Sequence, residues 1–294
     1  MKLARYRQHG SPRLGLVIGD RIADISAPIS ASVPGFGDDM RALLAAGPSV
    51  MEALRVFAAS SPATVALTDV RLEAPITNPQ KFLAIGMNYQ DHAEEARKAG
   101  MPVPTSQLWF NKQVSCITGP FDAVHVPRDA AERVDYEGEL GVVIATRCRR
   151  VKAADAHTVI AGYCTLNDVS ARDWQQKSPT FTLGKSWDTH GPMGPWIVTA
   201  DEVPDPHALQ LRTLVNGEVR QQASTALLIY NVWQQIEYLS TVMTLEPGDV
   251  LATGTCAGVG IAMKPPRFLV PGDVVRVEIE GVGTIENRFI AEPV

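Results

Sequence analysis

Cysteine is scarce in this sequence, and its placement argues against two kinds of protein. The 294 residues include four cysteines, which lie far apart and form no CxxC pair. Their spacing suggests neither a structural zinc site nor the disulfide framework of a small secreted domain. We therefore expect reduced thiols in a cytoplasmic protein. The four are Cys116, Cys148, Cys164 and Cys256.

Long apolar runs and an excess of positive charge are also missing. No run approaches the roughly 18 apolar residues that span a bilayer, and residues 1–6 lack the apolar core of a secretion signal. The 27 lysines and arginines are outnumbered by 32 acidic residues, with the two signs interspersed. Such a chain has no basic stripe to neutralise phosphates. The sequence therefore predicts a protein that binds neither membranes nor nucleic acids.

What remains is an ordinary globular composition, 45% hydrophobic and 20% charged. Two short apolar strands around Gly19-Asp20 and helical stretches at 40–46 and 51–57 predict a small N-terminal α+β domain over residues 1–75. A proline-containing linker over 75–79 leads into a strand-rich remainder. We therefore predict a second, larger domain over residues 76–294.

The stretch 135–144 carries the first chemical signal. Glu137 and Glu139 lead into an apolar, β-branched run that is typical of a strand entering the core. Alternate side chains of a strand share a face, so the two carboxylates project the same way, roughly 7 Å apart at the backbone. A hard divalent cation would relieve their repulsion by accepting an oxygen from each. The alternative is an exposed strand face on which both acids are solvated.

A second signal is a histidine beside a carboxylate. Residues 87–97 are predicted to be helical, and on a helix His92 and Glu95 stand at i and i+3, where they can touch. A carboxylate beside an imidazole fixes the orientation of the ring, as expected of a general base. The alternative is a surface pair on an amphipathic helix.

Three further polar residues stand near the ends of predicted elements. Asp168 follows a buried strand and could supply a third oxygen ligand or cap the next helical turn. Arg172, one turn later, could bind a substrate carboxylate. Lys185 lies in a loop dense in glycine and proline, residues 181–195, and is either a solvated charge or the counter-ion of a crowded anionic site.

The C-terminal third is predicted to be mostly scaffold. Asn216-Gly217 indicates a tight hairpin, and apolar spacing predicts one helix over 226–242. The glycine-rich stretch 253–260 could hold an anion through its amides. It matches neither the P-loop nor the dinucleotide fingerprint, so we predict no nucleotide binding.

Five segments, in order along the chain, resemble the fumarylacetoacetate hydrolase family. The resemblance runs from about residue 81 to residue 289, and the N-terminal part resembles the short variable domain of many members. It implies a mixed α+β, mainly β fold, the sandwich roll of the family, and commonly a homodimer. The segments are 86–95 (GMNYQDHAEE), 135–140 (DYEGEL), 167–173 (NDVSARD), 184–189 (GKSWDT) and 253–255 (TGT).

The resemblance also implies roles for single residues. Cys256 departs from the proline that many members have there, and His190 is an unusual extra polar group. An all-oxygen site suits Mg²⁺, or Mn²⁺, better than zinc. The implied metal ligands are Glu137, Glu139 and Asp168; the implied catalytic residues are His92, Glu95 and Lys185; the implied substrate-binding residues are Arg172, Gln175, Thr255, Lys112 and Tyr89.

The expected activity is hydrolysis of a C–C bond in a 2,4-diketo acid of the acylpyruvate type, such as fumarylpyruvate, giving pyruvate and a carboxylic acid. His92, oriented by Glu95, would deprotonate the attacking water. Decarboxylation of a 2-keto dicarboxylate such as oxaloacetate, or isomerisation of a hydroxymuconate, could use the same residues. A non-catalytic binding protein would lack a ligand or the His–Glu pair, and neither is missing here.

Overall fold

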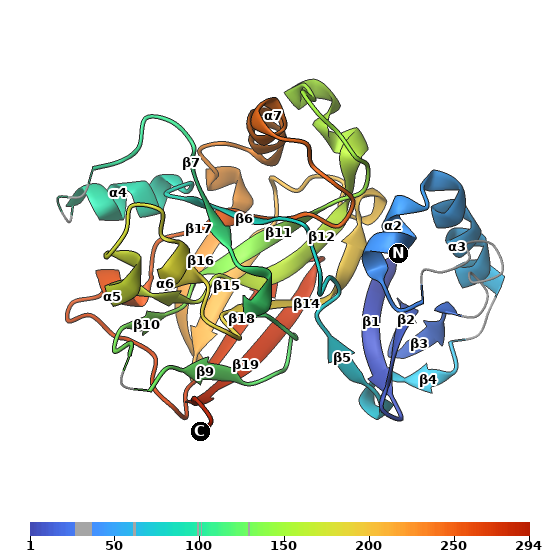
Figure 1. Cartoon of the computed structure of the whole chain (residues 1–294), viewed down its shortest axis with the longest axis horizontal. Coiled ribbons are helices and arrows are strands. Elements are labelled where there is room, and N and C mark those ends of the chain that lie inside the picture. The colour runs from blue at the N-terminus through green and yellow to red at the C-terminus, as the bar shows by residue number, and fades with distance from the viewer. Residues whose placement is uncertain (27–36, 61–62, 99, 101, 129) are drawn as a thin grey trace.

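A computed structural model describes residues 1–26, 37–60, 63–98, 100, 102–128 and 130–294. Strands dominate it (Figure 1), as the predicted mixed α+β, mainly β class requires. The larger sheet has, within the described residues, this strand order: β4 (Val65–Ala66), β3 (Arg21–Asp24), β2 (Ser11–Ile18), β1 (Lys2–Gln8), β14 (Gly191–Thr199), β12 (Ile160–Asn167), β11 (Gly138–Ile144), β17 (Val250–Thr255), β6 (Phe82–Gly86) and β7 (Leu108–Lys112), with β5 (Arg71–Glu73) on β1 and β8 (Ile117–Thr118) on β14.

A second sheet packs against β11 and β12 of the first. Its order is β16 (Glu218–Ser224), β15 (Gln210–Val215), β18 (Val274–Ile279), β19 (Gly283–Ala291) and β9 (Val124–Val126), and a separate pair joins β10 (Val134–Asp135) to β13 (Ser170–Ala171). Every residue of β11 and of β12 is buried, because these strands lie in the interior of the large sheet with the second sheet against them. Burial on both faces explains their near-continuous apolar sequences.

The helices lie around the sheets (Figure 1). The α-helices whose bounds the structure describes are α2 (Met40–Ala45), α3 (Pro48–Ser60), α4 (Gln90–Lys98), α5 (Arg172–Gln175), α6 (Thr182–Lys185) and α7 (Val232–Val242). None of the helices among the described residues is long and apolar enough to cross a membrane.

Both predicted hairpins are confirmed. Ile18 pairs with Arg21 across the Gly19-Asp20 turn, and Val215 pairs with Glu218 across Asn216-Gly217. In the second turn both central residues have positive φ, 52° and 81°, the conformation that favours Asn-Gly in two-residue hairpins.

The predicted helix over 226–242 begins too early. A short 3₁₀ turn occupies Thr225–Leu227, and α7 starts at Val232. Asn231 and Gln234 form a reciprocal capping box there, and this box fixes the start of the helix more strongly than apolar spacing does.

The N-terminal region and the remainder share a sheet. Strand β1 pairs with β14, placing Leu3 opposite Ile197, and Leu3, Leu14 and Leu54 belong to the same apolar cluster as Met193. That residues 1–75 and 76–294 are two separate domains stays a prediction. The two parts nevertheless share one of the apolar clusters of the described residues.

Candidate active site

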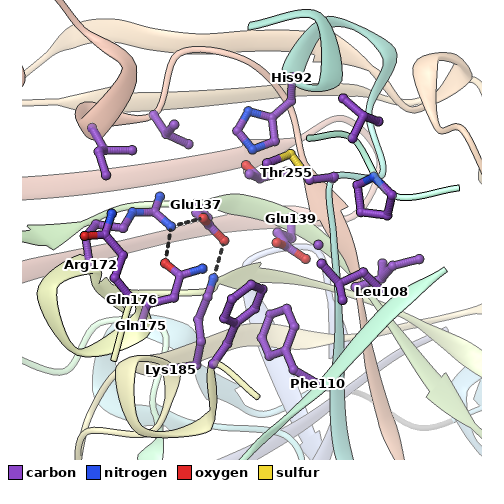
Figure 2. Close-up of a pocket in the computed structure, with 18 of the residues that line it drawn as sticks. His92, Leu108, Phe110, Glu137, Glu139, Arg172, Gln175, Gln176, Lys185 and Thr255 are labelled. Atoms are coloured by element: carbon purple, nitrogen blue, oxygen red, sulfur yellow. Dashed lines mark hydrogen bonds and ion pairs between the residues drawn. The ribbon is translucent and has the colours of Figure 1, made fainter. Parts of the chain in front are cut away.

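A pocket of about 440 Å³ lies where several elements of the larger domain meet. Its lining comes from α4, α5, α6, β6, β7, β17, the start of β11 and the segments that connect them (Figure 2). The lining combines acidic and basic side chains with aliphatic and aromatic ones. The pocket therefore combines a charged centre with an apolar surround, as binding sites for small organic molecules do.

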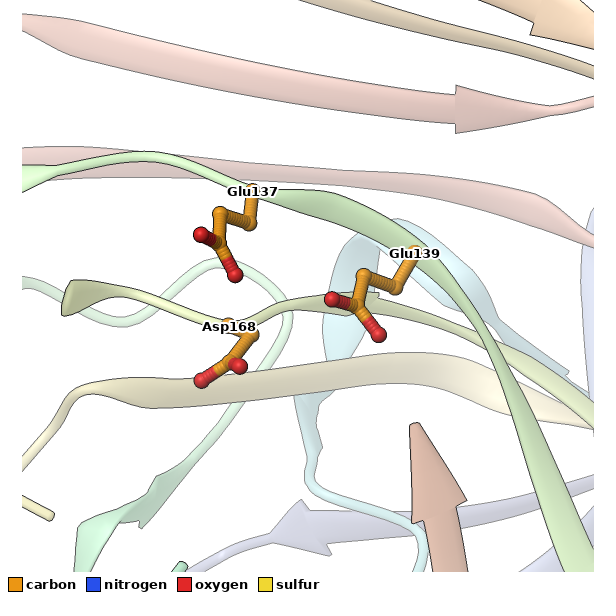
Figure 3. A group of neighbouring side chains, drawn as sticks. All are labelled: Glu137, Glu139 and Asp168. Atoms are coloured by element: carbon orange, nitrogen blue, oxygen red, sulfur yellow. The ribbon is translucent and has the colours of Figure 1, made fainter. Parts of the chain in front are cut away.

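The register of two buried strands brings three carboxylates together (Figure 3). Gly138 of β11 pairs with Asn167 of β12, and the amide of Asp168 donates to the carbonyl of Glu137 at 2.8 Å. Glu137 and Asp168 thus flank the same end of an antiparallel strand pair, with Glu139 two residues further. One oxygen from each of the three lies within 4.8 Å of the others. All three carboxylates are buried, so the alternative of an exposed strand face with solvated acids is excluded.

Two of the three carboxylates have cations of their own. Lys185 Nζ lies 2.6 Å from Glu137 and 2.7 Å from Asp168. Arg172 Nη1 lies 2.7 Å from Glu137, and Lys112 Nζ lies 2.7 Å from Asp168. Lys185 is therefore a counter-ion of the anionic site, and the alternative of a solvated surface lysine is excluded.

Glu139 is the carboxylate without a cation. Among the described residues no lysine, arginine or histidine lies within ion-pair distance of it, and its one hydrogen bond comes from the amide of Gly254 at 2.7 Å. The anion held by this amide of the glycine-rich segment therefore belongs to the chain itself, and glycine is needed at 254 because its φ is 101° and a Cβ would lie 2.8 Å from Asn88 Cβ. A buried charge without a partner is costly, so the site is short of positive charge at Glu139.

The pKa values of the two glutamates diverge for this reason. Burial by itself would raise the pKa of Glu137, but the ion pairs with Lys185 and Arg172 outweigh it and lower that pKa to about 2. Burial, with Asp168 and Glu137 close by, raises the pKa of Glu139 well above its ordinary value. Three buried oxygen donors with one carboxylate uncompensated fit a hard divalent cation, and the triad is a candidate site for one.

The predicted contact between His92 and Glu95 is present. His92 Nδ1 lies 3.0 Å from Glu95 Oε2, and His92 lines the pocket above the carboxylates (Figure 2). The other oxygen of Glu95 accepts from the amide of Gly258 at 3.2 Å. Because Glu95 engages Nδ1, the Nε2 atom of His92 is left to face the pocket.

Arg172 has a different set of partners from the one predicted. Its Nε and Nη2 lie 2.9 Å from Asp135 Oδ2, and its Nη1 also donates to Gln175 Oε1 at 3.0 Å. Arg172 and Gln175 both line the pocket. The guanidinium is nevertheless committed to Asp135 and Glu137, which leaves little of it for a substrate carboxylate.

Asp135 is a structural residue that sequence reasoning missed. Its side chain is fully buried and accepts from the amides of Gly260 at 2.7 Å and Ile261 at 3.0 Å, besides Arg172. A Cβ at position 260 would lie 2.6 Å from Asp135 Oδ1, so glycine is needed there. The signal was available, because Asp135 precedes the two glutamates in the segment that carries the family resemblance.

Replacing Asp135 by asparagine is expected to lower the free energy of unfolding by about 3 kcal/mol, since it removes one partner of a buried ion pair. Asparagine keeps one acceptor oxygen for the Gly260 amide but loses the Oδ2 acceptor that faces both Arg172 and the Ile261 amide, so the loss reports that oxygen and its charge. Urea denaturation measures it. Asp20→Asn, in an exposed turn, is the matched control and should stay within about 0.5 kcal/mol of the parent. Equal stability of the two variants would contradict the role given to Asp135.

Thr255 lines the pocket, but its hydroxyl is already engaged. It donates to the carbonyl of Gly138 at 2.9 Å and accepts from Gln221 Nε2 at 2.7 Å. Gln221 also accepts from the Gly138 amide at 2.9 Å, so this buried glutamine, which sequence reasoning missed, joins β16 to the start of β11. Nothing in the local sequence around Gln221 signals that role.

Two predicted substrate-binding residues do not lie at the pocket surface. Lys112 is buried behind Asp168 and also donates to the carbonyls of Lys185 and His190. The side chain of Tyr89 is fully buried. Neither residue lines the pocket, which is not the placement that we predicted. Lys112 instead joins Asp168 to the segment that carries Lys185.

The two departures from the family pattern also lie inside the protein. His190 is fully buried and bonds through Nε2 to the carbonyl of His125 at 2.8 Å, and burial lowers the pKa of His190 to about 3. Cys256 is buried, next to Thr255 at the end of β17. Neither side chain lines the pocket.

The comparison with known proteins agrees with this arrangement. Residues 81–290 match the family model of the fumarylacetoacetate (FAA) hydrolase C-terminal domain. The chain belongs to the fumarylacetoacetate hydrolase family. A Burkholderia ambifaria protein that is named only as a presumed hydrolase is 44% identical over 288 residues, which are 96% of each chain.

Three solved structures resemble the whole chain. The maleylpyruvate hydrolase of Sphingobium sp. SYK-6, in complex with manganese(II) and pyruvate, has a TM-score of 0.82, 33% identity and 100% coverage of both chains. The fumarylacetoacetate hydrolase of psychrophilic Exiguobacterium antarcticum has a TM-score of 0.82 and 37% identity, covering 99% of this chain and 100% of its own. The 5-carboxymethyl-2-hydroxymuconate delta-isomerase of Mycobacterium smegmatis has a TM-score of 0.77, 35% identity and 100% coverage of both.

These findings confirm the predicted family and its fold. The protein is an enzyme, and the family and the relatives named above place it among hydrolases. The manganese bound by the Sphingobium enzyme and the acidic triad of this chain together support a site for a divalent metal ion.

Proposed function

We propose that this enzyme hydrolyses the C–C bond of a 2,4-diketo acid of the acylpyruvate type, yielding pyruvate and a carboxylic acid, with Mg²⁺ or Mn²⁺ bound by Glu137, Glu139 and Asp168. One observation carries the proposal. Glu137 and Glu139 of the cation-deficient triad line the same pocket as His92, and each is backed by its partner, Asp168 for the glutamates and Glu95 for the histidine. The triad can hold a metal ion that binds an oxo-acid, and the His92–Glu95 pair can activate water.

In the proposed reaction the carboxylate triad holds the metal ion and His92 transfers the proton. When bound, the divalent ion would polarise the carboxylate and 2-oxo oxygens of the substrate and stabilise negative charge there. His92 accepts a proton from water at Nε2 while Glu95 holds Nδ1. The water oxygen bonds to the distal carbonyl carbon, the bond between that carbon and C3 breaks with its electron pair on C3, and His92 returns the proton to C3.

Lys185 contributes charge and position. Its ammonium group bridges Glu137 and Asp168 and reaches the pocket surface beside Phe110, with Nζ 5.0 Å from the ring centroid. A fixed cation at this point favours a substrate in which negative charge develops during bond cleavage. The Oε1 atom of Gln175 accepts from Arg172, which leaves its Nε2 atom as a candidate donor to substrate oxygens. The predicted homodimer stays a prediction.

A second candidate is isomerisation of a hydroxymuconate-type acid, which the similarity to the Mycobacterium smegmatis isomerase favours. That reaction moves a proton without consuming water, so His92 could serve it too. The products distinguish the two reactions, and also decarboxylation.

The test is to incubate the Mn²⁺-loaded enzyme separately with acylpyruvates, oxaloacetate and a 2-hydroxymuconate, and to identify the products by mass spectrometry. We expect pyruvate plus one carboxylic acid, with one ¹⁸O from labelled water in that acid. Exhaustive chelation should abolish turnover and added Mn²⁺ should restore it. Turnover that survives chelation, or an isomer as the main product, would defeat the proposal.

A further inference from the structure

One wall of the pocket is apolar. Figure 2 shows Leu108 on the side of Glu139 that faces away from Arg172, and Phe110 below Glu139, beside Lys185. Phe110 packs edge-on against Phe181, with ring centroids 5.8 Å apart and an interplanar angle of 70°. We call Leu108, Phe110 and Phe181 the apolar wall. It can bury hydrocarbon beside the charged centre, but it offers no side-chain donor.

The lysine and arginine that line the pocket are already paired. Lys185 faces Glu137 and Asp168, and Arg172 faces Asp135 and Glu137. No other lysine or arginine is among the described residues that line the pocket, and none occurs in the sequence at the positions outside the described part. A negative charge at the far end of a substrate would therefore meet no unpaired cation from these residues.

The charge balance of the centre leads to the same conclusion. Four buried carboxylates face three buried cations, which leaves one negative charge in excess. A divalent ion reverses this to one positive charge, which balances one carboxylate. A substrate with two carboxylates would leave a buried negative charge without compensation, and such a charge is costly. The seven groups are Asp135, Glu137, Glu139, Asp168, Lys112, Arg172 and Lys185.

We infer that the substrate is a monocarboxylic acylpyruvate whose acyl group is an uncharged alkyl or aryl chain seated on the apolar wall. The inference rests on the proposed function and narrows its range of substrates. It excludes dicarboxylic diketo acids such as fumarylpyruvate as preferred substrates. It excludes oxaloacetate, which also carries two carboxylates, for the same reason. The keto-acid end lies at the triad, and the acyl carbons lie against Leu108 and Phe110.

Two unreactive oxamates test the inference by binding alone. N-butyloxamate and N-(3-carboxypropyl)oxamate share the oxo-acid end and differ in a methyl or carboxylate at the tail. Isothermal titration of each into the Mn²⁺-loaded protein should show the butyl compound binding at least about tenfold more tightly. Equal or tighter binding of the carboxylated compound would overturn the inference, and so would failure of the butyl compound to bind protein that holds Mn²⁺.

A charge placed on the wall is the second test. Leu108 is only partly buried, so a longer side chain has room to reach solvent. Leu108→Lys should shift the ratio of the two affinities toward the carboxylated oxamate by at least about tenfold. Leu108→Gln, which is polar but uncharged, should weaken binding of N-butyloxamate without strengthening binding of N-(3-carboxypropyl)oxamate. An unchanged ratio in folded Leu108→Lys, with circular dichroism as the check of folding, would show that the tail does not lie on this wall.

The two levels of the proposal fail separately. If no diketo acid yields pyruvate, the proposed function is wrong whatever the oxamates show. If pyruvate forms but kcat/KM is higher for fumarylpyruvate than for butanoylpyruvate, the hydrolase assignment stands and the inference about the acyl group is wrong.

Discussion

Glutamine in place of Glu139 is expected to weaken Mn²⁺ binding at least about 100-fold and to abolish turnover. The substitution preserves size and retains an oxygen to accept from the Gly254 amide, so it removes little besides charge. Of the triad, Glu139 is the member that lacks a cation of its own. Its charge is therefore the one that a metal ion would chiefly compensate. Isothermal titration with Mn²⁺ measures the affinity.

In the absence of metal, substituting the two glutamates should change the free energy of unfolding in different directions. Glu139→Gln removes an uncompensated buried charge beside two others, so metal-free protein should be as stable as the parent or more so. Glu137→Gln leaves Lys185 and Arg172 each short of a partner, so metal-free protein should lose about 2 kcal/mol. Urea denaturation in excess chelator measures both variants.

The stabilisation by Mn²⁺ tests whether the three carboxylates are the metal site. Saturating Mn²⁺ should stabilise the parent by roughly 3 kcal/mol at a hundred times its dissociation constant and Glu139→Gln far less. If Glu139→Gln bound Mn²⁺ within threefold of the parent, the triad would not be the metal site.

Those parts of the site that depend on spacing along the chain could be predicted from sequence. Glu137 and Glu139 are two residues apart on an extended segment, so their side chains share a face. His92 and Glu95 lie one helical turn apart. Each pair therefore meets through backbone geometry alone. The Asn-Gly hairpin was predictable for the same reason, because its turn chemistry is contained in two residues.

The rest of the site depends on contacts between distant segments, which local periodicity does not record. Lys112, at the end of β7, pairs with Asp168, which follows β12, although three strands separate β7 from β12 in the sheet order. Gln221 reaches Thr255 from the second sheet. The family resemblance implied a substrate contact for Lys112, but the fold places this lysine behind the carboxylates. Tyr89 was misplaced in the same way, since a tyrosine next to a helix start can face either the pocket or the core.

Asp135 shows how a signal can be present and still be read incompletely. It stands two residues before Glu137, so alternation along an extended segment places it on the same face as both glutamates, but the sequence alone does not name its partner. Only the fold shows that Arg172 receives Asp135 and Glu137 together. The arginine thus holds the acidic centre in position, and a role in binding substrate carboxylate becomes secondary.

Asparagine in place of His92 is expected to lower kcat by about 10²- to 10⁴-fold, the usual contribution of a positioned general base. The Mn²⁺ affinity should stay within about twofold of the parent, because His92 is not one of the three clustered carboxylate residues. Steady-state kinetics on an alkyl acylpyruvate, with titration of Mn²⁺ into the same preparation, gives both quantities.

A matched control lies on the same helix. Glu94 is half-exposed and contacts Arg97 and Lys98, so Glu94→Gln should leave kcat unchanged and stability within about 0.5 kcal/mol. Glu95→Gln keeps an acceptor for the Gly258 amide but removes the charge beside the imidazole, so its loss of kcat should fall between those of the other two variants. If His92→Asn retained kcat within threefold, water would have to be activated by another group. Of the described residues that line the pocket, the remaining acids are Glu137 and Glu139, which the metal would occupy, so the hydrolytic mechanism itself would then be wrong.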